Sequence, residues 1–96
     1  MHSTEAASAF SALGSASRLK VLRTLVRVGP QGLRVNEIQQ RTGIAASTLA
    51  HHLKVLCDGG VIEQSRVGRL TLNQACFDRL EELAAFILSE CCVDNE

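Results

Sequence analysis

The pattern of apolar and polar positions predicts a chain made mostly of helices. An alanine-rich segment over residues 4–13 favours helix, and a second helix is expected between Ser15, a good N-cap, and the helix-breaking Gly29. Two shorter helices are predicted over residues 35–42 and 47–56, with a Gly-containing turn between them. The apolar residues of the second of these, three leucines, share one face, so that its other face is free for contacts.

After this helix pair the pattern changes to short strand-like runs. Residues 61–74, VIEQSRVGRLTLNQ, hold two such runs around a turn at Val67-Gly68, which predicts a β-hairpin. Arg66 and Arg69 flank its tip, where long cationic side chains can reach phosphates or a minor groove. A helix pair over about residues 35–57 followed by such a hairpin indicates a winged helix-turn-helix, although a helical hairpin alone is not specific.

The C-terminal residues 75–92 are predicted to form a last helix with an apolar stripe. Five apolar residues step by three and four positions and therefore share one face: Phe77, Leu80, Ala84, Ile87 and Cys91. Such a helix has more apolar surface than one small core can bury, so we expect a dimer formed by the terminal helices. With 96 residues and 46% apolar content, the chain is expected to be a single domain over residues 1–96, mainly α with a small β-hairpin.

Charge is distributed unevenly along a chain whose net charge is zero. Between Arg18 and Arg69 there are nine basic and three acidic residues, whereas from Leu70 onward there are one basic and six acidic residues. A basic middle beside an acidic tail is expected when one face of a protein meets phosphates. Solvated charges without any partner would explain the same distribution equally well.

Other features narrow the class of protein. The N-terminus, MHSTEAASAF, has neither the basic region nor the apolar run of a signal peptide, and no apolar run approaches the ~20 residues of a membrane span. We therefore expect a cytoplasmic protein without membrane association and with reduced thiols. No nucleophile with a base partner and no phosphate-binding loop can be found, so an enzyme is not expected. A protein-interaction module remains possible.

Two runs, FSALGSASRLKVLRTL and VNEIQQRTGIAASTLAHHLKVLCDGGVIEQSRVGRLTLN, resemble the ArsR/SmtB family of bacterial winged-helix repressors. Members of this family are dimers that leave their operator DNA when a metal, metalloid or oxidant reaches a cysteine or histidine site. The resemblance covers about residues 10–92 and is sharpest at residues 47–56 and at the wing tip, Gly68-Arg69. It implies contacts with base edges and sugars by Ala46, Ser47, Thr48, Ala50 and His51, and contacts with phosphates by Arg41, Lys54, Arg66 and Arg69.

The adjacent cysteines Cys91 and Cys92 are the candidate inducer site. A disulfide between them is disfavoured, because consecutive Cα atoms lie only ~3.8 Å apart. On a regular helix their side chains diverge by ~100°, so both sulfurs can hold one soft ion only if the last turn unwinds. A subgroup of the resembled family ends its last helix with a similar pair and senses arsenic there, which implies arsenite or antimonite as the inducer and no constitutive cofactor. The third ligand stays open between Cys76 of a second subunit, Cys57 and a small-molecule thiol.

Other sites and functions were weighed against this one. Residues 35–40 lack the Cys-x-Cys metal box of some family members, and residues 75–92 contain no histidine for a zinc site. Metal ligation by His51 or His52 is not favoured, and His52 is expected to be a packed or capping residue. Cys91 can also serve as an apolar residue closing the stripe. The alternative function is a thiol-based redox or reactive-sulfur sensor on the same scaffold, with a disulfide between subunits or one that involves Cys57 or Cys76.

Overall fold

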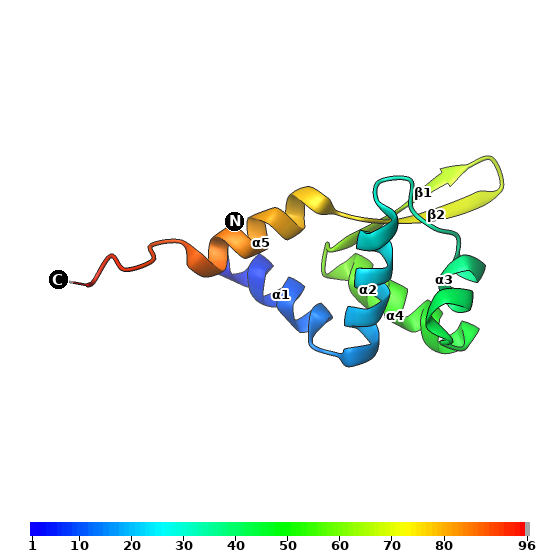
Figure 1. Ribbon diagram of the computed structural model, residues 1–96, viewed down its shortest axis with the longest axis horizontal. Helices are drawn as coiled ribbons and strands as arrows, with labels where there is room; N and C mark the ends of the chain where they lie inside the picture. Colours follow the sequence, from blue (N-terminus) through cyan, green and yellow to red (C-terminus); the bar gives the residue numbers. More distant parts are fainter. Residues whose placement is uncertain (96) are drawn as a thin grey trace.

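The computed structural model describes residues 1–95 and confirms the expected fold class, mainly α with a β-hairpin in a winged helix-turn-helix arrangement (Figure 1). The elements follow one another as α1 (Ser3–Leu13), α2 (Ala16–Val28), α3 (Val35–Thr42), α4 (Ala46–Asp58), β1 (Ile62–Val67), β2 (Leu70–Ala75) and α5 (Phe77–Leu88). Among these helices, none combines the length and the apolarity that crossing a membrane requires.

The helix boundaries in the first half of the chain follow local signals. Ser15 caps α2, its hydroxyl oxygen accepting the N–H of Arg18 at 3.3 Å. Gly43 ends α3 in the left-handed conformation, with a φ of +74° that favours glycine. Gly14 ends α1 as expected, but its φ is −78°, so the chain turns there without a left-handed residue. Residue type thus predicted where these helices stop more reliably than how they stop.

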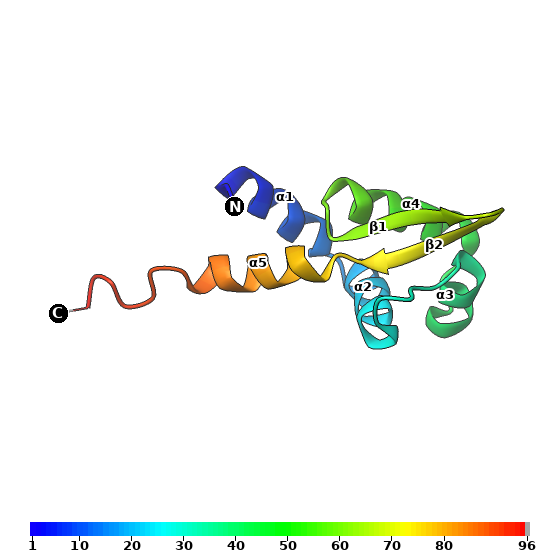
Figure 2. The ribbon, with the colours of Figure 1, turned by 90° about the horizontal axis from the view of Figure 1, so that it is seen from above.

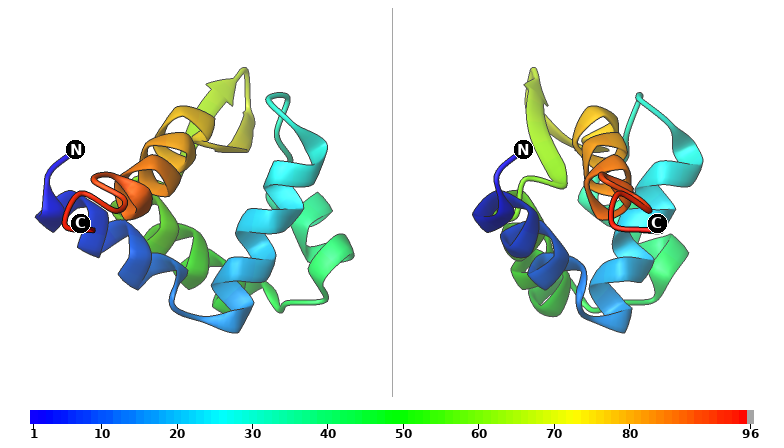
Figure 3. Two further views of the ribbon diagram at one scale, coloured as in Figure 1. Left: turned by 60° about the vertical axis from the view of Figure 1, so that its left-hand side comes forward. Right: turned by 90° about the vertical axis from the view of Figure 1, so that its left-hand side faces the viewer.

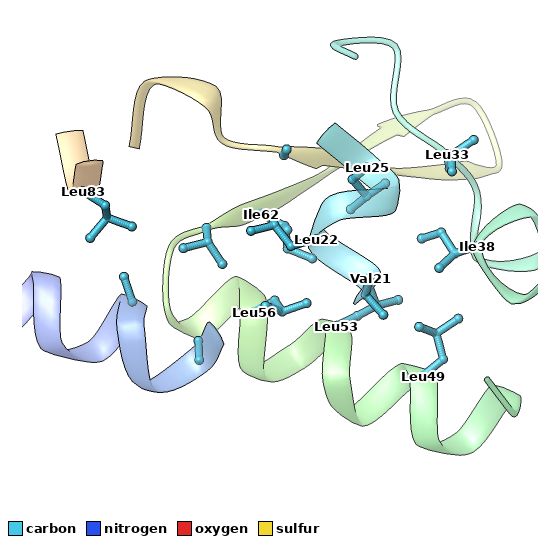
Figure 4. Packing of buried hydrophobic residues seen from close by; sticks show 14 of the residues in the cluster. Val21, Leu22, Leu25, Leu33, Ile38, Leu49, Leu53, Leu56, Ile62 and Leu83 are labelled. Atoms are coloured by element: carbon cyan, nitrogen blue, oxygen red, sulfur yellow. The ribbon is translucent and has the colours of Figure 1, made fainter. Parts of the chain in front are cut away.

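The core lies between α2, α4, the end of α3 and the base of the hairpin. Leu49, Leu53 and Leu56 of α4 point together toward α2, as predicted from their helical spacing (Figure 4). Val21, Leu22 and Leu25 of α2 meet them, and Ile38, Val61 and Ile62 close the cluster from α3 and the start of β1. Burial of this leucine face leaves the opposite face of α4 exposed.

The hairpin is the predicted wing, with its turn one residue later than expected. Val67 pairs with Leu70, so the turn residues are Gly68 and Arg69 rather than Val67 and Gly68. Gly68 takes a φ of +63°, which suits the tight connection. Figure 2 shows the two strands extending together beyond the helices to an isolated tip. The wing is therefore free to reach a partner beside α4.

A further backbone bridge, which the sequence did not indicate, joins the base of the wing to the loop after α2. Leu33 pairs with Asn73 of β2, with backbone hydrogen bonds of 2.9 and 2.8 Å. The side chain of Asn73 is fully buried, donates to the carbonyl of Leu33 at 3.2 Å and accepts the side-chain amide of Gln64 at 2.7 Å. These bonds fasten the wing to the helix-turn-helix.

Helix α1 packs closely on the C-terminal end of α4. Three alanines at every third position of α1 are buried, namely Ala6, Ala9 and Ala12. A Cβ added to Gly59, directly after α4, would lie only 2.6 Å from the Cβ of Ala12. Glycine is required there by this close approach and not by its backbone conformation, since its φ is −78°.

Helix α5 leaves the body of the domain beside α1, and its last residues lead into a C-terminal tail at the end of the molecule opposite the wing (Figures 1 and 2). Leu83 is buried and Phe77, Leu80 and Phe86 pack against the core cluster. Ile87 and Leu88 are 63% and 69% exposed. Of the predicted stripe, Phe77 and Leu80 are thus covered within one chain, whereas Ala84 and Ile87 are exposed.

The prediction that the last helix extends to Cys91 was wrong, because α5 ends at Leu88. The hydroxyl of Ser89 donates to the carbonyl of Phe86 at 2.8 Å and its N–H donates to the same carbonyl at 3.2 Å, which satisfies that carbonyl locally. The acidic residues Glu90 and Asp94 that follow are also unfavourable at the negative end of a helix. Cys91 therefore lies outside the helix and does not belong to its apolar stripe.

Candidate nucleic-acid interface and cysteine site

The outer face of α4 carries the residues that the sequence assigned to DNA. Ala46, Ser47, Thr48, Ala50, His51 and Lys54 are all exposed. Ala45 precedes them as the N-cap and has no side-chain oxygen, so the first N–H groups of α4 remain available to an anion. Small side chains and free N–H groups together allow a sugar–phosphate backbone to approach α4 closely.

The turn between the two helices, residues 43–45, is held by Thr42. Its buried hydroxyl donates to the carbonyl of Ile38 at 2.8 Å and accepts the N–H of Ile44 at 3.3 Å. The ammonium of Lys20 on α2 donates to the carbonyl of Thr42 at 3.0 Å. Bonds from two helices to this residue fix the angle at which α4 leaves α3, and hence how its outer face is presented.

The basic residues divide into those engaged within the fold and those left free. Two residues of the basic middle make hydrogen bonds within the fold. The Nε of Arg18 donates to the carbonyl of Ala12 at 2.6 Å, and the ammonium of Lys20 donates to the carbonyl of Thr42. Arg41, in the last turn of α3, and the wing residues Arg66 and Arg69 are exposed and have no ion pair among residues 1–95. These three side chains are available to phosphates.

Lys54 is neither free nor firmly engaged, because it forms one exposed ion pair. Its Nζ is 3.2 Å from Oδ2 of Asp58, one helical turn further along α4, and the side chains are 74% and 69% exposed. Such an exposed pair contributes only ~0.3–0.5 kcal/mol, so a phosphate can replace the carboxylate at little cost. Lys54 therefore remains a candidate for phosphate contact.

The two adjacent histidines of α4 face different surroundings. His51 is exposed, whereas His52 is half-buried with an Nδ1 that has no hydrogen-bond partner. Burial, followed by the positive charges of Arg18 and His51, holds the pKa of His52 below its ordinary value of 6.5. Over residues 1–95, no three His, Cys, Asp or Glu side chains come together as a metal site.

The cysteines form an inner and an outer pair. Cys57, at the end of α4, and Cys76, after β2, are half-buried. Burial raises the pKa of the Cys57 thiol, with a smaller contribution from Asp58. Burial also raises the pKa of the Cys76 thiol, with contributions from Glu63 and Cys57. Both inner thiols are thereby kept protonated, which makes them weaker nucleophiles and weaker ligands.

Cys91 and Cys92 form the outer pair, in the turns beyond α5. Both are exposed, and their Sγ atoms lie 3.3 Å apart. The backbone brings them together with a φ of +62° at Glu90 and +65° at Cys92, outside any regular helix. The absence of a three-residue cluster among residues 1–95 means that neither Cys57 nor Cys76 of the same chain completes a three-ligand site with this pair.

Comparisons with known proteins agree with this architecture. Residues 13–65, more than half of the chain, match the family model described as a helix-turn-helix domain. No curated protein sequence matches the chain.

Several solved structures are similar to the chain over nearly all of its length. An ArsR-like transcriptional regulator from Rhodococcus sp. RHA1 is 26% identical, with a TM-score of 0.80 over 95% of this chain and 82% of that one. The homodimeric winged helix-turn-helix DNA-binding domain of a possible ArsR-family transcriptional regulator from Mycobacterium bovis is 25% identical, with a TM-score of 0.70 over 92% of this chain and 82% of that one. The transcriptional repressor BigR from Xylella fastidiosa is 26% identical, with a TM-score of 0.69 over 93% of this chain and 88% of that one. The chain therefore belongs to the helix-turn-helix domain family and is a transcriptional regulator of the ArsR family.

Proposed function

We propose that this regulator is a homodimeric repressor that leaves its operator when a trivalent metalloid, arsenite or antimonite, binds Cys91 and Cys92. The observation that carries the proposal is the 3.3 Å separation of two exposed sulfur atoms beyond the end of α5. A regular helix would point adjacent side chains ~100° apart, so this backbone already has the unwound form that a two-thiol chelate needs.

The chemistry requires only the two thiols and arsenous acid. Each thiol proton leaves with one hydroxyl group of the acid as water, and each sulfur forms a bond to arsenic, which stays trivalent. The third position on arsenic keeps a hydroxyl or takes a further thiol. Because no third ligand from residues 1–95 joins the pair, that thiol would come from a second subunit or from a small molecule.

Contacts along the chain supply a route from this site to α4. Arg79 of α5 pairs with Glu5 of α1 at 3.1 Å, and Leu83 is buried in the cluster that contains the α1 alanines. At its other end α1 lies against Gly59, through the close approach of Ala12. A change in the tail that moves α5 is therefore expected to move α1, and with it the end of α4.

A second copy of the chain is the expected partner of the uncovered apolar surface on α5. Ile87 and Leu88 are largely exposed, and Phe10 on the neighbouring α1 is exposed as well. Burying them between two copies would hold two α4 helices at a fixed spacing, as half-sites ~34 Å apart on DNA require. The similar domain from Mycobacterium bovis is homodimeric, which supports a dimer of this chain. Ligand binding beside the seam could then change the spacing of the two helices.

The redox alternative has less support. Its inner candidates, Cys57 and Cys76, have raised pKa values, which lowers their thiolate fraction and slows their reaction with peroxide. A disulfide between Cys91 and Cys92 would require a strained connection between adjacent residues.

The experiment is a titration of arsenite into a complex of the protein with an operator selected from random duplexes, followed by fluorescence anisotropy in a phosphine reductant. We expect release of the DNA with loss of two free thiols per chain. The variants Cys91→Ser and Cys92→Ser should bind DNA but not respond, whereas Cys57→Ser and Cys76→Ser should still respond; a response that needs more arsenite in one of these two would identify the third ligand. Survival of the complex in arsenite, or a normal response from the first two variants, would overturn the proposal; release by peroxide alone would favour the redox alternative.

A further inference from the structure

A shallow hollow lies on the surface where α2 packs beside α3, and the left-hand view of Figure 3 shows these two helices next to each other. Its volume is about 330 Å³, and it is lined by Thr24 and Arg27 of α2 and Arg41 of α3. The side chains of two arginines from different helices thus line one small hollow. The sequence singled out Arg41 but gave no reason to single out Arg27.

Among residues 1–95, neither arginine has an acidic partner in an ion pair. Glu37, the one acid of α3, is already engaged, because it accepts the N–H of Arg34 at 2.9 Å and lies 3.3 Å from its Nε. These bonds to Arg34, with a smaller contribution from the charge of Arg41, hold the pKa of Glu37 below its ordinary value of 4.5 and keep it ionised. Glu37 therefore balances part of the charge of Arg41 but forms no ion pair with it, and an anion between Arg27 and Arg41 would reduce the repulsion between these two like charges.

Thr24, the third residue that lines the hollow, has no free donor for an anion. Its hydroxyl donates to the carbonyl of Lys20 at 2.8 Å, so its one proton is already used within α2. The short side chain leaves the space between the two arginines unfilled. The anion would therefore be held by the guanidinium groups alone, which bind phosphate oxygens through paired N–H donors.

We propose that this hollow binds a phosphate group of the DNA backbone and extends the DNA contact from α4 and the wing to α2. The proposal rests on the proposed DNA-binding function. It follows from continuity with that surface, because Arg41 lies in the last turn of α3, directly before the turn that leads into the exposed face of α4. We expect a duplex lying along α4 to pass this end of α3, and a phosphate bound by Arg41 would then be open to Arg27 of α2, because both side chains line the hollow.

The test measures the salt dependence of binding to duplex DNA by the full chain and by Arg27→Gln. Removing one phosphate contact should lower the slope of log K against log salt by about one, to a similar extent on operator and unrelated duplexes. Arg23→Gln is the matched control, since Arg23 is also an exposed arginine of α2 but does not line the hollow. Thr24→Val, which replaces the hydroxyl by a methyl group of similar size, should give the same salt slope as the wild type.

The outcomes separate this inference from the function on which it rests. Equal slopes for Arg27→Gln, Arg23→Gln and the wild type would overturn the phosphate site while leaving DNA binding intact. A wild-type chain that binds no duplex would overturn the proposed function itself. If NMR titration with inorganic phosphate shifts the signals of the hollow, and Arg27→Gln abolishes that shift without altering the DNA slope, the occupant is a free anion and the assignment to the DNA backbone is wrong.

Discussion

Replacing Gly59 by alanine should loosen the contact between α1 and the end of α4. The new Cβ would stand 2.6 Å from the Cβ of Ala12, whereas carbon atoms pack best at ~3.5–4.0 Å, so one helix must move by about 1 Å. Neither atom belongs to a flexible side chain that could turn away. Overpacking of this kind costs about 1–3 kcal/mol, and the reduced freedom of the unfolded chain returns about 0.4–1 kcal/mol. We therefore expect a net loss of about 1–2 kcal/mol of unfolding free energy.

Urea unfolding at one fixed protein concentration measures this loss, since the stability of a dimer depends on concentration. With a slope of about 2 kcal/mol/M, typical of a small domain, the midpoint should fall by roughly 0.5–1 M. Combining Gly59→Ala with Ala12→Gly removes one of the two clashing carbons, so the double variant should be more stable than the sum of the single effects predicts.

A second glycine provides a control with a different cause. Gly43 has open space around its missing Cβ but a φ of +74°, so Gly43→Ala should lose stability through backbone strain and show no coupling with Ala12→Gly. Wild-type stability in Gly59→Ala, or strictly additive effects of Gly59→Ala and Ala12→Gly, would refute the close contact and the route from α5 to α4 that depends on it.

Three other predictions concern single side chains. Asn73→Ala should lower the unfolding free energy by about 1–3 kcal/mol in urea titrations, because it removes the two hydrogen bonds that this fully buried side chain makes to Leu33 and Gln64, whereas the exposed Asn36→Ala should change little. Because the pKa of His52 is lowered in the folded chain, the unfolded chain takes up a proton first as pH falls below about 7. The unfolding free energy, measured in urea at several pH values, should therefore drop between about pH 7 and 5. This drop should be smaller in His52→Gln than in His51→Gln. Lys54→Ala should cost less than ~0.5 kcal/mol of stability in urea titrations but lower the salt slope of DNA binding by about one; an unchanged slope would remove Lys54 from the interface.

The parts of the fold that the sequence predicted are those set by local interactions. The leucine face of α4 follows from helical spacing alone, and Ser15 and Gly43 mark helix ends through bonds to their own neighbours. The exposed face of α4, and with it most of the predicted DNA contacts, follows from the same spacing, because the face opposite the leucines must point to solvent.

What the sequence did not indicate depends on pairs of residues distant in the chain. Leu33 and Asn73 are 40 residues apart, and a single leucine in a Gly- and Pro-containing loop gives no strand pattern. Arg18 and Lys20 look like free charges until packing brings backbone carbonyls to them, whereas Arg27 gains a role only because α2 lies beside α3.

The end of α5 was predicted too late in the chain, because the apolar spacing was followed and Ser89 was not considered. Spacing alone carried the stripe through Cys91, but Ser89 binds the carbonyl of Phe86 and ends the helix first. The outer cysteine pair thus lies beyond the helix, where the apolar spacing did not predict it.

The acidic tail that helps to end α5 also places negative charges beside the two cysteines in the sequence. Glu90 precedes Cys91 directly, and Asp94 follows Cys92 after one residue. At an exposed site a unit charge ~4 Å away contributes about 1 kcal/mol, so two carboxylates lower the local concentration of an anion such as arsenate several-fold. Undissociated arsenous acid carries no charge and meets no such barrier. If the pair binds arsenous acid as proposed, the charge of the tail would favour trivalent over pentavalent arsenic before any bond to sulfur forms.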